Sequence, residues 1–367
     1  MRAHSPFDLV EDQHTLAQAC ALLDGTELVA VDTEFVREST YFARLCLIQL
    51  ATDKLVAGID CLAELDLGPL FARILDPKMT WIVHSGRQDI EVVWHAAGSK
   101  PSRVYDTQIA AALLGEPPQI GLREILGATL GVEIHKTLTR TNWAKRPLPA
   151  NALEYALDDV RHLPELWRRL SERLVGANRL EWFLEDCERA LDVPLEPDLA
   201  TLYQRTKGTG KLRNAGVDTA LALLDWREER SRRANRPRRW ILSDEALVAL
   251  ASRRPREPAE LHEIAGLPER TIAKSGPEIL VAIASSSEPR FSGLAVERGA
   301  PSRLDLTLLK SLQTQVRGCA ARLGIEPEVV AAKRDIVGCV LGTPPERLCS
   351  GWRAHYLQLP RRDPDSR

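Results

Sequence analysis

The pattern of hydrophobic and polar positions divides the chain into two parts. In the first part, short apolar runs typical of β-strands occupy residues 27–35, 43–52, 54–60 and 80–85. A segment of helical period, residues 67–75, lies between the third run and the fourth, and mainly helical segments follow the fourth. This succession predicts an α/β layer with a mixed sheet, in which strands come first along the chain and helices later.

The second part has a different pattern. From about residue 170 onward, β-branched alternation nearly vanishes and short helical segments punctuated by Pro and Gly replace it. Charge changes in the same region: residues 181–200 hold seven acidic residues against one Arg, whereas residues 205–240 hold eleven Lys or Arg against four acids. Although the net charge is only −2, this shift predicts a domain boundary near residue 200 and a basic surface after it.

Two carboxylates follow the apolar run of residues 28–31. Asp32 and Glu34 stand two positions apart on the predicted strand, so their side chains point to the same face. A pair of this kind is most often a solvated strand edge. Like charges that close together are costly to ionise unless a cation lies between them, so the pair is also compatible with a divalent metal and oxygen ligands.

Two further segments carry acidic residues in specific settings. Tyr155 and Asp159 lie four residues apart in a segment of helical period, residues 151–170, which places both side chains on one helix face. Asp89 comes four residues after Ser85, which we predict to be a helix N-cap. Asp89 would then lie in the first helical turn, where the helix dipole favours an acid.

Two nearby acids are left out of the predicted site. Asp158 precedes Asp159 and points about 100° away from it on a helix. Asp106 is a candidate cap for the helix that follows it.

In their order and context, these motifs resemble the DEDD exonucleases, in which a DxE motif, a middle Asp and a final Asp hold two divalent metals. The spacing of Tyr155 and Asp159 is that of the Tyr subclass, because the His subclass has His where this chain has Glu154. Over about residues 27–170, the segments VDTEFVRESTYFARLCLIQL, HSGRQDIEV, YDTQIAAALLG and WAKRPL are similar to the ribonuclease D family. One departure is Asn142, which stands where that family usually has Asp.

The resemblance implies a ribonuclease H-like exonuclease domain, which we place at residues 1–200. It implies two divalent metal ions, Mg²⁺ or Mn²⁺, and hydrolysis of RNA from its 3′ end to nucleoside 5′-monophosphates, with transfer RNA precursors and small structured RNAs as substrates. The catalytic residues that it implies are Asp32, Glu34, Asp89, Tyr155 and Asp159; all except Tyr155 are expected metal ligands.

The second part of the chain resembles the small all-α HRDC module of helicases and ribonuclease D. We place one HRDC domain at residues 207–288, and a second, divergent copy at 300–360. Within the first copy, Ser243 is a predicted N-cap followed by Asp244 and Glu245, a pattern that starts a helix on physical grounds alone.

Arginines crowd the chain between Trp226 and Trp240. In an arbitrary protein, such a cluster is most often a solvated helix face; beside a nuclease domain, guanidinium groups suit phosphates and stack on bases. A smaller basic stretch precedes the segment that carries Tyr155. The residues predicted to contact RNA are Lys136, Arg140, Lys145, Arg146, Arg232, Arg233, Arg238 and Arg239.

The composition of the chain indicates its cellular compartment. Seven cysteines without a CxxC pair favour a reducing cytoplasm, and no apolar stretch approaches the length of a signal or membrane segment. We expect a cytoplasmic monomer. Two alternatives remain: a DNA 3′-5′ exonuclease of the same superfamily, and a catalytically silent nucleic-acid-binding protein, which would be preferred had any of the five site residues been replaced.

Overall fold

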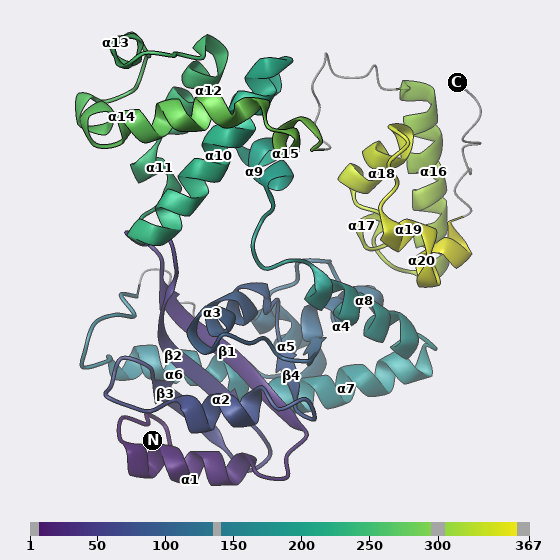
Figure 1. The fold of residues 1–367 in the computed structure, drawn as a ribbon. Coiled ribbons are helices and arrows are strands. Elements are labelled where there is room, and N and C mark those ends of the chain that lie inside the picture. The colour runs from purple at the N-terminus through teal and green to yellow at the C-terminus, as the bar shows by residue number, and fades with distance from the viewer. Residues whose placement is uncertain (1–6, 135–140, 295–304, 358–367) are drawn as a thin grey trace. The chain divides into compact units, whose positions relative to one another are not determined.

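The computed structural model describes residues 7–134, 141–294 and 305–357. The chain divides into two compact units (Figure 1). The first consists of Met1–Val36, Leu45–Val193 and Leu304–Arg367, and the second of Arg37–Arg44 with Pro194–Arg303. The loop after the first strand is therefore part of the second unit, although both strands that it joins belong to the first.

A five-stranded sheet forms the centre of the first unit, with the order β3-β2-β1-β4-β5. Strands β1, β4 and β5 are parallel, whereas β2 and β3 are antiparallel, so the predicted mixed sheet is confirmed. The strands are β1 (Leu28–Val36), β2 (Arg44–Ala51), β3 (Val56–Asp60), β4 (Thr80–Val83) and β5 (Arg103–Asp106).

Helices cover the sheet, and several contact its strands directly: α6 packs against β1 and β3, α3 against β1, and α8 against β5. The helices of this part are α1 (Gln13–Leu23), α2 (Gly68–Ile74), α3 (Arg87–Ala97), α4 (Thr107–Leu113), α5 (Leu122–Leu130), α6 (Ala150–Arg161), α7 (Leu163–Gly176) and α8 (Leu180–Asp192).

The C-terminal helices of the first unit share its core. Trp352 stacks on Trp182 of α8 with ring centroids 4.7 Å apart, and Arg353 forms an ion pair with Asp186 of the same helix. The helices are α16 (Leu306–Leu323), α17 (Pro327–Val330), α18 (Lys333–Val340), α19 (Glu346–Cys349) and α20 (Gly351–Tyr356).

The second unit is built around the long helix α10, whose apolar residues lie in the core of the unit. Around it pack α9, α11, α12, α14 and the short helix η2. The helices are α9 (Leu199–Arg205), η1 (Thr209–Lys211), α10 (Ala215–Ala234), α11 (Arg238–Ile241), α12 (Asp244–Arg253), α13 (Pro258–Leu261), α14 (Glu269–Ala284), η2 (Ser285–Ser287) and α15 (Pro289–Ser292).

The predicted strands and the helix at residues 67–75 all form, with ends shifted by a few residues. Two features differ. The segment 151–170 is divided into α6 and α7 around His162, because Pro164 at the start of α7 has no N–H to continue the helix. Strand β5 has only four residues and no alternation, so periodicity gave no signal for it. Across the described part of the chain, every helix is too short or too polar to cross a bilayer.

Ser243 caps α12 as predicted, because its Oγ accepts a hydrogen bond from the Ala246 N–H at 3.1 Å. Replacing Ser243 with Ala is expected to destabilise the start of α12 by about 1 kcal/mol. Faster hydrogen exchange over residues 244–253 would report the loss. Ser252→Ala is a matched control, because this exposed hydroxyl bonds back to the Val248 carbonyl within the helix; equal effects of the two substitutions would contradict the cap.

Candidate active site

The carboxyl ends of the parallel strands border one cleft. Asp32 and Glu34 lie on β1 beyond the part of the strand that pairs with β4, and the turn after β4 leads into α3, which carries Asp89. Helix α6, which packs against β1, supplies Tyr155 and Asp159. In sheets with parallel strands, ligands commonly bind at the carboxyl ends of the strands, because the loops and helix starts that follow adjacent strands converge there.

The predicted catalytic residues come together in a cleft of about 400 Å³. Oxygen atoms of Asp32, Glu34 and Asp159 lie within 4.8 Å of one another. Asp89 and Tyr155 line the same cleft. All five residues, from three separate segments of the chain, therefore line one cleft.

Asp89 is held in place by the strand that it faces. Thr33 lies between Asp32 and Glu34 on β1 and lines the same cleft. The backbone N–H of Thr33 donates to Asp89 Oδ1 at 3.0 Å, and its hydroxyl donates to the same atom at 2.5 Å. These two bonds tie α3 to β1 and set the orientation of the carboxylate; Thr33 carried no sequence signal for this role.

The turn that leads into α3 differs from the prediction. Ser85 does not cap the helix: it adopts a left-handed conformation with φ of 64°, and Gly86 is the N-cap residue, without a side-chain bond. Asp106 stabilises this turn instead, because its carboxylate accepts from the backbone N–H groups of Ser85 at 3.0 Å and Gly86 at 3.3 Å. It also caps α4 as predicted, through the N–H of Gln108.

Gly86 is required by the close approach of the backbone to β4. A Cβ atom at this position would lie 2.6 Å from the Cβ of Val83, which is closer than packed carbon atoms can come. The chain therefore turns sharply enough for Asp89 to fall in the first turn of α3, as predicted.

Burial and mutual repulsion raise the pKa values of the clustered acids. Burial raises the pKa of Asp32 well above its ordinary value, and Asp89, Asp159 and Glu34 raise it further. Burial, followed by the charges of Asp159 and Asp89, raises the pKa of Glu34 to about 8. Burial is also the main reason why the pKa of Asp159 rises to about 7. The cluster thus resists full ionisation at neutral pH unless positive charge enters it.

Tyr155 is a hydrogen-bond donor in this setting. Its hydroxyl bonds to the carboxylate of Asp159, and its ring lies 6.5 Å from that of the buried Trp143. Burial and the neighbouring carboxylates of Asp159 and Glu34 raise the pKa of the phenol, so that it stays protonated at neutral pH. Asp158 forms an ion pair with Arg161 and lies outside the cluster, as predicted.

The cleft suits a hard divalent cation. The described residues that line it include four carboxylates but neither Lys nor Arg. Carboxylate oxygens are the ligands that Mg²⁺, Mn²⁺ and Ca²⁺ prefer, and several of them around one point supply the negative charge that such an ion needs. The donor set therefore fits a divalent metal.

The residues predicted to contact RNA have varied surroundings. Lys136 and Arg140 lie outside the described residues, and Lys145 is exposed. Arg146 forms an ion pair with the buried Asp60 and donates to the carbonyl of Cys46 at 3.0 Å. This side chain ties the segment with Trp143 to β2 and to the edge strand β3.

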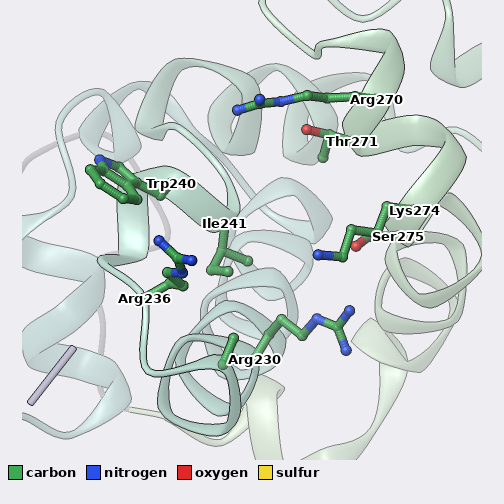
Figure 2. Close-up of a pocket in the computed structure, with 9 residues that line it drawn as sticks. Arg230, Arg236, Trp240, Ile241, Arg270, Thr271, Lys274 and Ser275 are labelled. Atoms are coloured by element: carbon green, nitrogen blue, oxygen red, sulfur yellow. The ribbon is translucent and has the colours of Figure 1, made fainter. Parts of the chain in front are cut away.

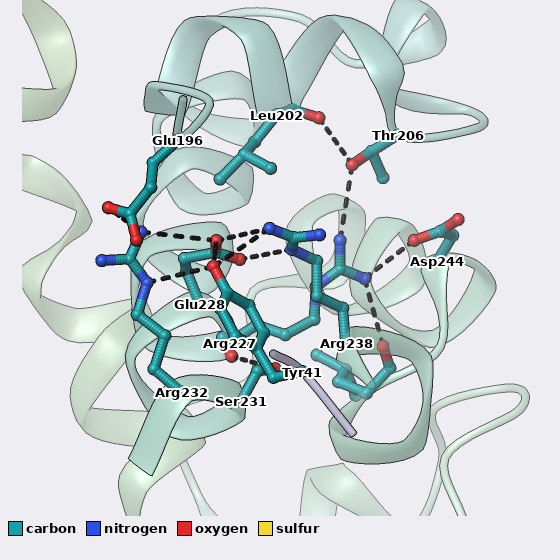
Figure 3. A network of polar contacts seen from close by, with 11 residues as sticks. Tyr41, Glu196, Leu202, Thr206, Arg227, Glu228, Ser231, Arg232, Arg238 and Asp244 are labelled. Carbon is teal, nitrogen blue, oxygen red and sulfur yellow. Dashed lines mark hydrogen bonds and ion pairs between the residues drawn. The ribbon is translucent and has the colours of Figure 1, made fainter. Parts of the chain in front are cut away.

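Two of the four arginines predicted in the second unit belong to an internal network (Figure 3). Arg238 pairs with the buried Glu228 at 2.5 Å, and Arg232 pairs with Glu196 at 2.9 Å. Both guanidinium groups also bond to the hydroxyl of Tyr41, which donates to Glu228. Arg233 and Arg239 are more exposed, and their ion pairs, with Glu229 and Glu245, are between exposed side chains.

Family comparisons agree with this geometry. The 3′-5′ exonuclease family matches residues 7–175, and the HRDC domain family matches residues 219–283. Together with the acidic cluster, these matches define the class of the protein as a 3′-5′ exonuclease with an HRDC domain. Exonucleases of this class use divalent metals, and the acidic cluster is the candidate site for them.

The relatives narrow the class to one family. Ribonuclease D of Gluconacetobacter diazotrophicus is 35% identical over 336 residues, which cover 89% of this chain and 84% of that protein. Ribonuclease D of Sphingobium indicum is 34% identical over 369 residues, which cover 96% and 92%. The crystal structure of Escherichia coli RNase D matches with a TM-score of 0.83 at 26% identity, covering 96% of this chain and 97% of that one. The chain belongs to the ribonuclease D family, and its activity is that of a 3′-5′ exoribonuclease.

The raised pKa of Glu34 predicts how the metal-free protein responds to pH. Between about pH 4.5 and pH 8, the folded protein keeps a proton on Glu34 that the unfolded chain releases. Stability therefore falls as pH rises through this range. Glu34→Gln removes this cost, so in EDTA at pH 8 the variant is expected to melt a few degrees above the wild type, with the difference vanishing near pH 4.5.

Thermal melts in EDTA across this pH range would measure the effect, and Glu38→Gln provides the control, because it removes the same charge at an exposed position outside the cleft. A Glu34→Gln variant less stable than the wild type at pH 8 would contradict the assigned repulsion.

Proposed function

We propose that this exoribonuclease removes nucleotides one at a time from the 3′ end of RNA, using two divalent metal ions, Mg²⁺ or Mn²⁺. The observation that carries the proposal is the meeting of four carboxylates in one cleft whose described lining holds no cationic side chain. Four such charges roughly balance two divalent cations. The expected ligands are Asp32, Glu34, Asp89 and Asp159. When bound, the metals would lower the pKa of the attacking water and stabilise charge on the phosphate.

The side chains of the cleft then have distinct tasks. Thr33 holds Asp89 at a fixed orientation, so that its carboxylate faces the same cleft as those of Asp32 and Glu34. Tyr155 remains protonated, so its hydroxyl serves to orient the attacking water by hydrogen bonding and not to remove a proton. Attack on a phosphodiester at the free 3′ end would release a nucleoside 5′-monophosphate.

We further propose that the substrates are transfer RNA precursors with 3′ extensions and other small structured RNAs. The Escherichia coli protein is described as an exoribonuclease involved in structured RNA processing, and its structure resembles this chain over nearly its full length. A DNA exonuclease is the less favoured alternative, because the similar curated proteins are ribonucleases. We expect the protein to act as a cytoplasmic monomer.

The helical parts would hold the substrate. We propose that the exonuclease domain spans residues 1–200, that an HRDC domain spans 207–288 and that a divergent HRDC-like domain spans 300–360. The basic residues suggested by the sequence remain candidates for RNA contacts. Among them, the exposed Lys145, Arg233 and Arg239 have the surroundings best suited to reaching a phosphate.

The direct experiment compares three substrates with the purified protein: a 3′-extended transfer RNA, the mature transfer RNA and a single-stranded DNA of matching sequence. Stepwise shortening of the extended RNA from its 3′ end is expected with Mg²⁺ or Mn²⁺, and none with EDTA. Equal or faster shortening of the DNA would favour the alternative function.

Asp159→Asn is expected to abolish cleavage while the fold and most RNA affinity persist, since the change removes one ligand charge from the cleft. Asp158→Asn is the matched control on the same helix, because its partner is Arg161 and it is not part of the cluster. The rate of nucleotide release and the circular dichroism spectrum of each variant provide the readouts. Activity in the Asp159 variant together with its loss in the Asp158 variant would reverse the assignment.

Tyr155→Phe keeps the ring beside Trp143 but deletes the hydroxyl that bonds to Asp159. The rate of cleavage at saturating metal is expected to fall by roughly 10²-fold, with little change in the metal concentration required for half-maximal activity. A large shift in that metal concentration instead would make Tyr155 part of metal binding.

A further inference from the structure

The second unit carries a groove that the acidic cleft does not use. Two adjoining hollows, of about 630 Å³ and about 390 Å³, share Trp240, Ile241, Arg270 and Thr271 in their linings. Figure 2 shows Lys274 extending from α14 and Arg236 from the segment before α11, on opposite sides of Ile241. Because both hollows include the same four residues, they form one continuous groove across α11 and the start of α14.

The groove is cationic. Its described lining contains Arg230, Arg236, Arg239, Arg270 and Lys274 but no Asp or Glu. Arg230 and Arg239 have acidic neighbours at 3.5 Å and 3.8 Å. Within the described residues, no ion pair engages Arg236, Arg270 or Lys274, which contrasts with Arg232 and Arg238 in their internal network. The three exposed cations therefore face solvent with unneutralised charge.

An aromatic ring lies between these charges. Trp240 is 58% exposed, which is unusual for the largest apolar side chain. It lines both hollows, and the guanidinium of Arg236 lies 5.7 Å from the centre of its ring. An exposed indole among cations offers a base a surface for stacking while the flanking groups bind phosphates on either side.

We propose that this groove, which we call the Trp240 groove, binds single-stranded RNA, with one base stacked on Trp240 and the neighbouring phosphates paired with Arg236, Arg270 and Lys274. The inference rests on the proposed function, because RNA is the polyanion that this enzyme meets. An acidic peptide would satisfy the cations but would gain little from the indole, whereas a nucleotide chain uses both. Of the four arginines that the sequence indicated in this unit, Arg239 lines the groove, whereas Arg232, Arg233 and Arg238 are not among its described lining residues.

The test measures binding of a fluorescent single-stranded RNA to the full chain in EDTA, so that no cleavage occurs. Trp240→Ala is expected to weaken binding by about 5- to 150-fold, since base stacking contributes about 1–3 kcal/mol, and Trp240→Phe is expected to retain most of the affinity. Replacing Arg236, Arg270 and Lys274 together with Gln should reduce the slope of log affinity against log salt by about 2, at about 0.7 for each lost contact with a single strand.

A matched triple variant provides the control. Arg253, Arg254 and Arg256 are exposed on the same unit but outside both hollows, so their replacement with Gln removes equal charge. An equal change in salt slope for the two triple variants, or unchanged RNA affinity in Trp240→Ala, would contradict RNA binding in the Trp240 groove. Stronger competition by polyglutamate than by unlabelled RNA would also overturn it, in favour of an acidic protein partner.

Cleavage of a trinucleotide separates this inference from the proposed function. Groove variants are expected to hydrolyse it at the wild-type rate when it is saturating, because the groove supplies affinity and no catalytic group. If the wild type does not hydrolyse RNA while its binding still depends on Trp240, the proposed function fails and the groove stands. If the wild type hydrolyses RNA and the Trp240 substitution does not change RNA affinity, the proposed function stands and the groove is not an RNA-binding site.

Discussion

Repulsion among four carboxylates is the constraint on which the catalytic unit depends. The folded chain brings Asp32, Glu34 and Asp159 within 4.8 Å of one another and places Asp89 beside them, so the folded state has an electrostatic cost in the absence of a cation. The surrounding structure resists this repulsion. Thr33 binds Asp89, and Asp106 holds the turn before α3. A site that is strained when empty has correspondingly more to gain when divalent ions enter it.

Arginine has two different roles in the second unit. Arg238 and Arg227 pair with acids at the core side of α10, where Glu228 and Asp244 neutralise them. Arg236, from the same stretch of sequence, instead lines an open groove beside an exposed indole. A cluster that looks uniform in the sequence is therefore divided by the fold into residues that stabilise structure and residues that remain available to a polyanion.

Local geometry could be predicted from the sequence, whereas distant partners could not. Tyr155 and Asp159 share a helix face because residues four apart always do, and the apolar runs defined four of the five strands. In contrast, Arg146 meets Asp60 across 86 positions, and Arg238 meets Tyr41 across 197. Periodicity contains no information about such pairs. The same limitation hid β5, whose four residues are placed by their neighbour β4.

The loop Arg37–Arg44 joins β1 to β2 yet folds with the second unit. The Asn235 side chain accepts hydrogen bonds from the backbone N–H groups of Tyr41 and Phe42, each at 3.1 Å. The strand that carries Asp32 and Glu34 is therefore continuous with a segment that depends on α10 for its conformation. The two parts therefore cannot be exchanged independently in evolution. Replacing this HRDC module with another would require a loop between β1 and β2 that fits the new module.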